Sequence, residues 1–290
     1  MKIKFKTVAI CSSQSNNQIN QIANQCCEVL LSINVKVLLT KNLSKISKNQ
    51  KCKIVNDTSL RKADLIIVIG GDGSILGVAR EYSPLGVPLL GINLGNIGFL
   101  ADIPPESITT TLTEIIYGKF IKDKRFLLEA SINKERNSYN ALNEIVIHSG
   151  AVAQLIEYEL FIDDVFVFRQ RADGIIINSP TGSTAYSLSG GGPIIHPSVN
   201  AITLLPMFPH SLSTSPLLVN DNSAIEIRMV GSKNKSTLTL DSHNLVKLKK
   251  GDVISIKKTD YELTLVHPIG HDFFASCRNK LGWSSAIKSS

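Results

Sequence analysis

The chain of 290 residues lacks the sequence features that mark several protein classes. It has no apolar run near the roughly 18 to 20 residues that a membrane-spanning helix needs. The apolar piece at Thr7 to Cys11 is also too short for the core of a signal peptide. Its five cysteines form no C-x-x-C pair and lie far from any cluster of histidines, which favours free buried thiols. We therefore expect a soluble, cytoplasmic protein that does not bind a membrane.

Several common catalytic motifs are missing as well. There is no G-x-x-x-x-G-K-[ST] sequence, which disfavours a P-loop kinase or ATPase, and Leu76 occupies the last position of a would-be G-x-G-x-x-G. The six histidines show neither H-E-x-x-H nor another ligand spacing, so no metal site of the protein's own is predicted. Ser183, within T-G-S-T-A, lacks the G-x-S-x-G pattern of a serine hydrolase.

Composition and charge narrow the class further. With 43% hydrophobic and 19% charged residues, a chain of this length can bury a substantial core, and two domains of roughly 100 to 170 residues are expected. The net charge of +7 suits either an anionic small substrate or a nucleic acid. The densest lysine group, between Lys41 and Lys53, lies in a Ser/Asn-rich stretch without aromatic residues, which favours a solvated loop. No nucleic-acid partner is predicted.

Strands and helical segments alternate over residues 1–120, and this alternation predicts a parallel sheet flanked by helices, a Rossmann-like α/β domain. The predicted strands are Thr7 to Cys11, Val35 to Leu39, Leu65 to Ile69 and Val87 to Ile92. The predicted helices are Asn16 to Ser32, Ser74 to Tyr82 and Pro105 to Tyr117.

From residue 121 the pattern changes to strands joined by turns, which predicts a β-rich domain of the sandwich type over residues 121–270. Asp163-Asp164 is the expected tip of a hairpin. A tail of residues 271–290 regains helical character at Asp272 to Lys280 and is expected to pack back on the first domain. The predicted strands are Phe126 to Ile132, Ala141 to His148, Ala153 to Ile162, Val165 to Arg171, Gly174 to Asn178, Ala224 to Val230, Ser236 to Leu240, Val253 to Lys258 and Leu263 to His267.

The most informative segment is Gly70-Gly71-Asp72-Gly73-Ser74, between a buried strand and an apolar helix. Glycines let a ligand approach the backbone closely, and the amides that open a helix favour phosphate oxygens. The negative charge of Asp72 opposes an anion there, unless the side chain handles a hydroxyl proton or a metal ion. The combination indicates phosphoryl transfer, although the same spacing also fits a tight turn in which Asp72 caps the helix.

Two further segments carry polar side chains next to predicted strands. Asn143-Glu144 precedes an alternating strand, and it fits either a strand-entry turn or a grip on the vicinal hydroxyls of a ribose. The stretch from Arg171 to Pro197 combines many hydroxyls and glycines around Asp173. Its small residues leave room for a planar ring beside the backbone, and Tyr186 offers an aromatic face.

With these segments in view, the sequence resembles the bacterial NAD kinases, which phosphorylate the adenosine ribose of NAD to make NADP. The resemblance extends over nearly the whole chain, and its ordered segments make a chance match implausible. Beyond the three segments above, it includes GINLGNIGFLAD (Gly91 to Asp102), KRFLLEA (Lys124 to Ala130), ITLLPMFPHSLS (Ile202 to Ser213) and KLGWS (Lys280 to Ser284).

The resemblance implies a Rossmann-like domain, a C-terminal β domain, and a homodimer or homotetramer with NAD sites near subunit boundaries. It implies ATP and NAD as substrates, with a divalent ion, Mg²⁺, carried by ATP. Asp72 would be the catalytic base, while Gly70, Gly71 and Gly73 shape the phosphate-facing turn. His243 stands where related enzymes often carry glutamine. The residues implied to bind NAD are Asn143, Glu144, Arg171, Asp173, Thr184, Ala185, Tyr186, Ser187, Ser189 and His243.

Two other functions remain open at this stage. A lipid kinase of the diacylglycerol or sphingosine type shares a GGDG turn, but it should carry an apolar cleft in place of Asn143-Glu144 and the segment Thr181 to Ser189. A non-catalytic module that senses NAD or NADP would gain little from an acidic group facing phosphates.

Overall fold

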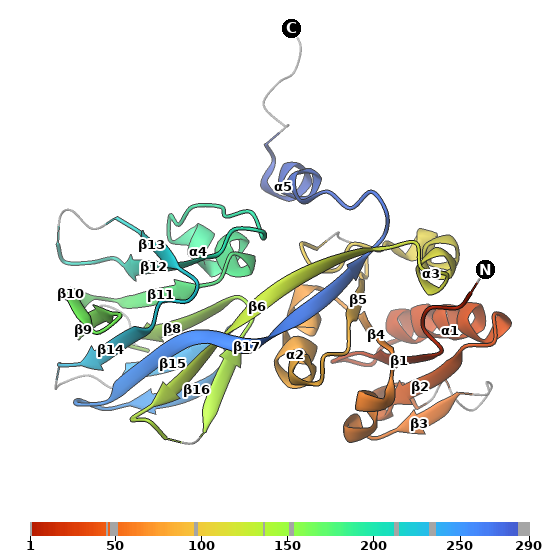
Figure 1. Cartoon of the computed structure of the whole chain (residues 1–290), viewed down its shortest axis with the longest axis horizontal. Helices are drawn as coiled ribbons and strands as arrows, with labels where there is room; N and C mark the ends of the chain where they lie inside the picture. Colours follow the sequence, from red (N-terminus) through yellow and green to blue (C-terminus); the bar gives the residue numbers. More distant parts are fainter. Residues whose placement is uncertain are drawn as a thin grey trace, which may run out of the picture. The chain divides into compact units, whose positions relative to one another are not determined.

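The computed structural model describes residues 2–44, 46, 52–95, 98–135, 137–150, 154–211, 215–231 and 236–283 (Figure 1). The chain forms two compact units: Met1–Lys124 together with Glu262–Ser290, and Arg125–Tyr261. Two strands, β6 (Ile121–Ile132) and β17 (Val253–His267), each run across a boundary between the units. The expected domain boundary after residue 120 lies four residues before the end of the first segment at Lys124, and the expected boundary after residue 270 lies nine residues beyond Tyr261.

The first unit contains a parallel sheet in the order β5, β4, β1, β2, β3, with the end of β17 parallel to β5. The α/β class predicted for this half is confirmed. Its strands are β1 (Thr7–Cys11), β2 (Lys36–Thr40), β3 (Lys53–Val55), β4 (Leu65–Ile69) and β5 (Leu89–Ile92). Its helices are α1 (Asn17–Ser32), α2 (Asp72–Tyr82), α3 (Ile108–Ile116) and α5 (Phe273–Leu281), with short 3₁₀ turns at Lys41–Leu43, Asp57–Lys62, Ser83–Leu85 and Pro105–Ser107.

The central strand β4 is buried on both faces. Leu65, Ile67 and Ile69 belong to the core that α1 and α3 share, while the alternate residues Ile66 and Val68 are also fully buried. A parallel sheet covered on both sides requires such a continuous apolar strand. This explains why LIIVI reads as a strand without polar alternation.

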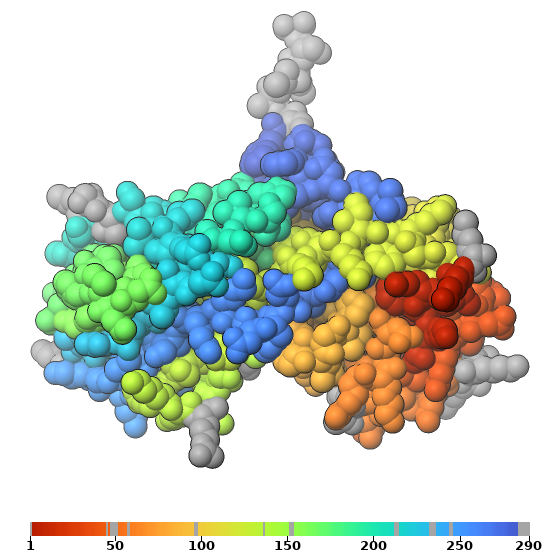
Figure 2. Space-filling view, in the orientation of Figure 1, coloured from red at the N-terminus to blue at the C-terminus, as the bar shows by residue number. Residues whose placement is uncertain are grey.

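The last part of the chain, from Glu262 onward, belongs to the first unit. In Figure 2 blue atoms from the last part of the chain lie against yellow atoms from the part around α3 and the start of β6. His267 and His271 both contact Asp102 within this region. Residues 284–290 of the expected tail lie outside the described residues.

The second unit consists of antiparallel sheets around a shared apolar core. One sheet has the order β13, β12, β11, β8, β15, β16; the other joins β10, β9, β14 and β17, with β6 on β17 and β7 on β6. The predicted β-rich domain is confirmed. The remaining bounds are β7 (Ser138–Ala141), β8 (Glu144–His148), β9 (Ile156–Ile162), β10 (Val165–Ala172), β11 (Gly174–Asn178), β12 (Ala201–Met207), β13 (Leu217–Asn220), β14 (Ile225–Met229), β15 (Ser236–Leu240), β16 (His243–Leu248), a 3₁₀ turn at Thr181–Thr184 and α4 (Tyr186–Ser189).

Some strand predictions for this half are wrong. The strand predicted from Ala141 to His148 begins only at Glu144, as β8, because the amides of Leu142 and Asn143 bond to the Asp241 side chain and leave the ladder. The two strands proposed between Val253 and His267 form one, β17. Five strands were not predicted from the sequence: β3, β7, β12, β13 and β16.

Two local features follow directly from residue type. Asp163 and Asp164 have φ values of 50° and 64°, the positive values that a two-residue hairpin turn requires, so the predicted tip between β9 and β10 is confirmed. Pro206 disfavoured the prediction of a strand at β12, because proline is uncommon within sheets; it lies beyond the residues of β12 that pair with β13.

Within the described residues, no helix combines the length and the apolar character needed to cross a membrane.

Candidate functional site

The glycine turn places Asp72 at the first position of α2. Gly70 has a φ of 153°, and a Cβ there would overlap the Ser74 side chain, so this position requires glycine. Gly71 is the N-cap and supplies no side chain, whereas a Cβ on Gly71 or Gly73 would meet nothing within 4 Å. Space is therefore left in front of the amides that open α2, where an anion is favoured.

The carboxylate of Asp72 is held by the loop that follows β5. Its Oδ2 accepts from the amide of Phe99 at 2.9 Å, and its Oδ1 accepts from those of Leu100 and Ala101 at 3.0 and 3.3 Å. A Cβ on Gly98 would overlap the same carboxylate. The side chain thus faces the loop and does not cap its own helix, so the tight-turn interpretation does not account for its orientation.

A cation from the end of the chain also reaches this carboxylate. The Lys280 ammonium, in the last turn of α5, lies 3.3 Å from Asp72 Oδ2 and 4.7 Å from the centroid of the Phe99 ring. Lys280 lies within the KLGWS segment, whose sequence predicts no role for it. Because Lys280 and Asp72 are 208 residues apart in the chain, no local sequence pattern could predict this contact.

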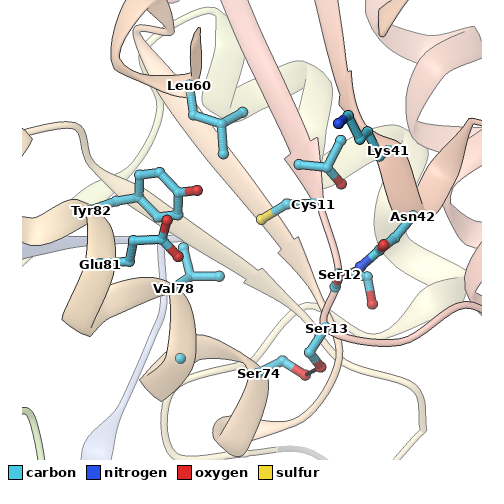
Figure 3. Close-up of a pocket in the computed structure, with 12 residues that line it drawn as sticks. Cys11, Ser12, Ser13, Lys41, Asn42, Leu60, Ser74, Val78, Glu81 and Tyr82 are labelled. Carbon is cyan, nitrogen blue, oxygen red and sulfur yellow. Dashed lines mark hydrogen bonds between the residues drawn. The ribbon is translucent and has the colours of Figure 1, made fainter. Parts of the chain in front are cut away.

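A pocket of about 380 Å³ opens beside the same helix, at the carboxyl ends of β1 and β2 (Figure 3). Ser13 and Ser74 lie at one end, with hydroxyl oxygens 2.8 Å apart, and Leu60 and Tyr82 form an apolar wall at the other (Figure 3). The hydroxyl of Thr40 lines this pocket, is buried, and has no hydrogen-bond partner among the described residues. Carboxyl ends of parallel strands are where α/β folds bind ligands. The pocket combines an apolar wall with a polar end next to a helix N-terminus.

In the second unit, Asn143 and Glu144 are buried, and their backbone is held by hydrogen bonds to the Asp241 side chain. The Asp241 carboxylate accepts hydrogen bonds from the amides of Leu142, Asn143 and Glu144 at 3.0, 2.7 and 3.2 Å. Asp241 and Ser242 have positive φ values and form the turn between β15 and β16. Asp241 was not among the predicted site residues; its only local signal is the polar Asp-Ser pair between two apolar strands.

Burial changes the chemistry of Glu144. Burial, together with the negative charge of Asp241, raises the pKa of Glu144 to about 8. Its Oε2 is buried without a hydrogen-bond partner among the described residues. A protonated carboxyl group can donate as well as accept a hydrogen bond. Glu144 can therefore act as both donor and acceptor near neutral pH.

The hydroxyl-rich segment after β11 packs against Asn143. A Cβ on Gly182 would overlap the Asn143 backbone, and the Ser179 hydroxyl donates to the Leu142 carbonyl. Buried Arg125 donates to Thr181 at 3.1 Å. Asn178 Oδ1 and Ser187 Oγ are buried and lack hydrogen-bond partners among the described residues. Buried polar atoms normally have a partner, so these two atoms are available to bond to a ligand.

The other predicted NAD-binding residues occupy different parts of this unit. His243 opens β16, two residues after Asp241, and is exposed; Tyr186 is 44% exposed on α4. Thr184 and Ala185 end the 3₁₀ turn that begins at Thr181, and Ser189 ends α4.

Arg171 and Asp173 are not brought to Glu144 within the chain. They lie before β11, whose register pairs Gly174 with His148 and Asn178 with Glu144. They are therefore at the opposite end of that strand, roughly 13 Å or more along it.

A cluster of Asp102, His267 and His271 provides three potential metal ligands in the first unit. Both Nδ1 atoms lie within 2.9 Å of Asp102 Oδ2, but the two rings stack at 3.8 Å with 15° between their planes. Nearly parallel rings cannot both direct a ring-plane lone pair at one ion. The cluster is better described as two hydrogen bonds that join the end of β17 and the segment after it to Asp102, at the end of the loop that carries Phe99.

The side chains of this cluster shift one another's pKa values. Burial alone would lower the pKa of His267, but the hydrogen bond with Asp102 and the nearby carboxylate of Asp123, 3.6 Å from its Nε2, raise it. Burial would raise the pKa of Asp102, but the two histidines lower it. Both directions favour the charged pair, which strengthens the tie.

Comparison with known proteins matches both halves of the chain. The sequence model of the ATP-NAD kinase N-terminal domain matches residues 8–120, and that of the ATP-NAD kinase C-terminal domain matches residues 142–268. A Teredinibacter turnerae protein named NAD kinase is 42% identical over 286 residues, which cover 97% of this chain and 98% of that protein. An Escherichia coli NAD kinase is 45% identical over 230 residues, or 78% of this chain and 79% of that protein.

Two solved structures share the fold. Yeast NADH kinase complexed with NADH gives a TM-score of 0.89 at 27% identity, covering 98% of this chain and 90% of that one. An NAD kinase from Archaeoglobus fulgidus in complex with ATP gives 0.73 at 26% identity, covering 95% and 97%.

Proposed function

This chain belongs to the ATP-NAD kinase family, and from that membership we propose how its residues divide the phosphorylation of NAD to NADP between them. ATP is the phosphoryl donor, and the 2′-hydroxyl of the adenosine ribose of NAD is the acceptor. Matches to both domains of this family remove the lipid-kinase alternative.

We assign Asp72 as the general base. The observation that carries this assignment is the fixed carboxylate at the N-terminus of α2, oriented by three backbone amides. Its side chain remains 27% exposed, so a hydroxyl group can approach it. Phosphoryl transfer leaves the protein mainly positioning and charge stabilisation, and a placed base typically contributes about 10² to 10⁴ in rate.

We propose that ATP binds in the first unit, with its base and ribose in the pocket beside α2 and its phosphates toward Gly71 and Gly73. Three features support this placement: the apolar wall at Leu60 and Tyr82, the unpartnered Thr40 hydroxyl, and the amides that open α2. The Archaeoglobus relative is described in complex with ATP.

A divalent ion, expected to be Mg²⁺, fits this donor set only as a partner of ATP. Both oxygens of Asp72 already accept hydrogen bonds, and the pocket offers hydroxyls at Ser13 and Ser74 and a carboxylate at Glu81. Mg²⁺ prefers oxygen ligands and usually retains phosphate and water oxygens. When bound with ATP it would neutralise phosphate charge.

We propose that NAD binds to the second unit through Asn143, Glu144 and the segment from Thr184 to Ser189. Buried, unpartnered oxygens on Glu144 and Asn178 and the Ser187 hydroxyl support this assignment, because each can bond to a ribose or amide group. The yeast relative is described in complex with NADH.

We further propose that His243 contributes to the NAD site, and that the protein is a cytoplasmic homodimer or homotetramer in which Arg171 and Asp173 complete this site. Arg171 and Asp173 lie at the end of β11 that is farther from Glu144. A second copy of the chain is therefore the simplest way to bring Arg171 and Asp173 to an NAD molecule that is bound at Glu144.

A coupled NADP-formation assay tests the function, with ATP and NAD each replaced in turn. We expect NADP only when both are present with Mg²⁺. If calorimetry detects NAD binding while no NADP forms, the protein is a sensing module and the proposed function is wrong.

A further inference from the structure

Helix α5 presents one face to the loop that holds Asp72. Phe273, Cys277 and Lys280 are spaced four and three residues apart, which places them on the same side of the helix. The Phe273 ring lies 6.2 Å from the Phe99 ring, and Cys277 is fully buried. The N-cap Asp272 accepts from the Phe274 amide, and Gly282 ends the helix in the left-handed region. Lys280 is thus carried by a capped, docked helix.

The Lys280 ammonium has capacity for a second partner. It is 32% exposed, and among the described residues its one hydrogen-bond acceptor is Asp72 Oδ2. An ammonium group has three N–H donors and sits on a flexible four-carbon stem. Because Asp72 opens α2, an anion at the N-terminus of that helix would lie within a short movement of this ammonium.

Building on the proposed function, we infer that Lys280 is a catalytic residue that contacts the terminal phosphate of ATP. Without nucleotide its ammonium pairs with Asp72 Oδ2; with ATP bound it transfers to the γ-phosphate, whose greater negative charge attracts it more strongly. The Asp72 carboxylate keeps its orientation after this transfer, because the amides of Phe99, Leu100 and Ala101 still hold it.

This exchange removes the Lys280 ammonium from Asp72 Oδ2 at the moment the base is needed. The oxygen accepts the proton of the ribose 2′-hydroxyl, the new bond forms between O2′ and the γ-phosphorus, and the bond from that phosphorus to the β-phosphate oxygen breaks. ADP leaves with the bonding electron pair. Lys280 remains protonated throughout and stabilises charge on the transferred group.

Nucleotide binding separates this role from a structural one. Calorimetry would compare AMP, ADP and the non-hydrolysable ATP analogue AMPPNP on Lys280→Met, Lys280→Arg and the control Lys119→Met, in which an exposed lysine paired with Glu114 is removed. We expect Lys280→Met to weaken AMPPNP about tenfold or more and to leave AMP unchanged. Lys280→Arg should recover most of the affinity, and Lys119→Met should match wild type.

Two results would overturn the inference. Equal losses for AMP and AMPPNP would mean that Lys280 only anchors α5, and unchanged affinity for all three nucleotides would mean that it contacts no phosphate. Thermal melts of each variant check that α5 still docks. The wild-type NADP assay tests the proposed function separately, since the binding series requires no turnover.

Discussion

The Asp241 carboxylate accepts a 2.7 Å hydrogen bond from the backbone amide of Asn143, a residue 98 positions earlier in the chain. The same carboxylate also accepts from the amides of Leu142 and Glu144. The Asp241 side chain therefore fixes the backbone position of Asn143 and Glu144, the pair that we assign to NAD binding.

Replacing Asp241 should damage both stability and NAD binding. Asp241→Ala leaves three buried amides without their acceptor, so the free energy of unfolding should fall by about 2 to 5 kcal/mol. Urea denaturation measures this loss, and KM for NAD should rise in the variant that remains folded. As a control, Asp163→Ala removes an exposed acceptor of one amide, that of Ala224, and should cost about 1 kcal/mol or less. An Asp241 variant with normal KM would contradict the positioning role.

Asp72→Asn should lower turnover about 10² to 10⁴-fold while NAD affinity changes little, because the amide side chain cannot accept the hydroxyl proton. Steady-state kinetics give kcat, and calorimetry gives the affinity for NAD. The asparagine oxygen can still accept from Leu100 and Ala101, so the loop should stay in place. Near-normal turnover would exclude Asp72 as the base.

Thr40→Val tests the pocket by separating stability from nucleotide binding. Removing a buried hydroxyl that has no partner should raise the free energy of unfolding by about 1 kcal/mol. If ATP supplies that partner, its affinity should fall several-fold. The matched control is Thr203→Val, which removes another buried, unpartnered hydroxyl on β12 in the second unit and should leave ATP affinity unchanged. Equal ATP affinity in both variants would place ATP elsewhere.

Glu144 should make stability depend on pH. Its folded pKa is raised from 4.5 to about 8, first by burial and then by Asp241. Between these values the folded protein keeps a proton that the unfolded chain has released. The contribution of Glu144 is therefore fully present below about pH 4.5, and the free energy of unfolding falls as pH rises toward 8. Urea denaturation from pH 5 to 9 measures the slope, which Glu144→Gln should reduce. An identical slope in that variant would mean that Glu144 titrates normally.

Local pattern was sufficient for the strands and turns whose signal lies within a few residues. LIIVI predicted a buried strand, and Asp163-Asp164 predicted a hairpin tip, because each depends on the chemistry of its own side chains. The break between β7 and β8 could not be predicted in the same way. It arises because Asp241, distant in the sequence, draws the amides of Leu142 and Asn143 out of the ladder.

The glycine turn, the polar pair and the hydroxyl-rich segment were readable from the chain itself, since close backbone approach and hydrogen-bonding capacity are properties of residue type. Those segments determined the family and the two-part α/β and β organisation. Only the tertiary structure decided which groups hold the acidic side chains: the Phe99 loop and Lys280 for Asp72, and burial beside Asp241 for Glu144. Hydrogen bonds and electrostatic fields act through space, so contacts between residues far apart in the chain leave no local trace in the sequence.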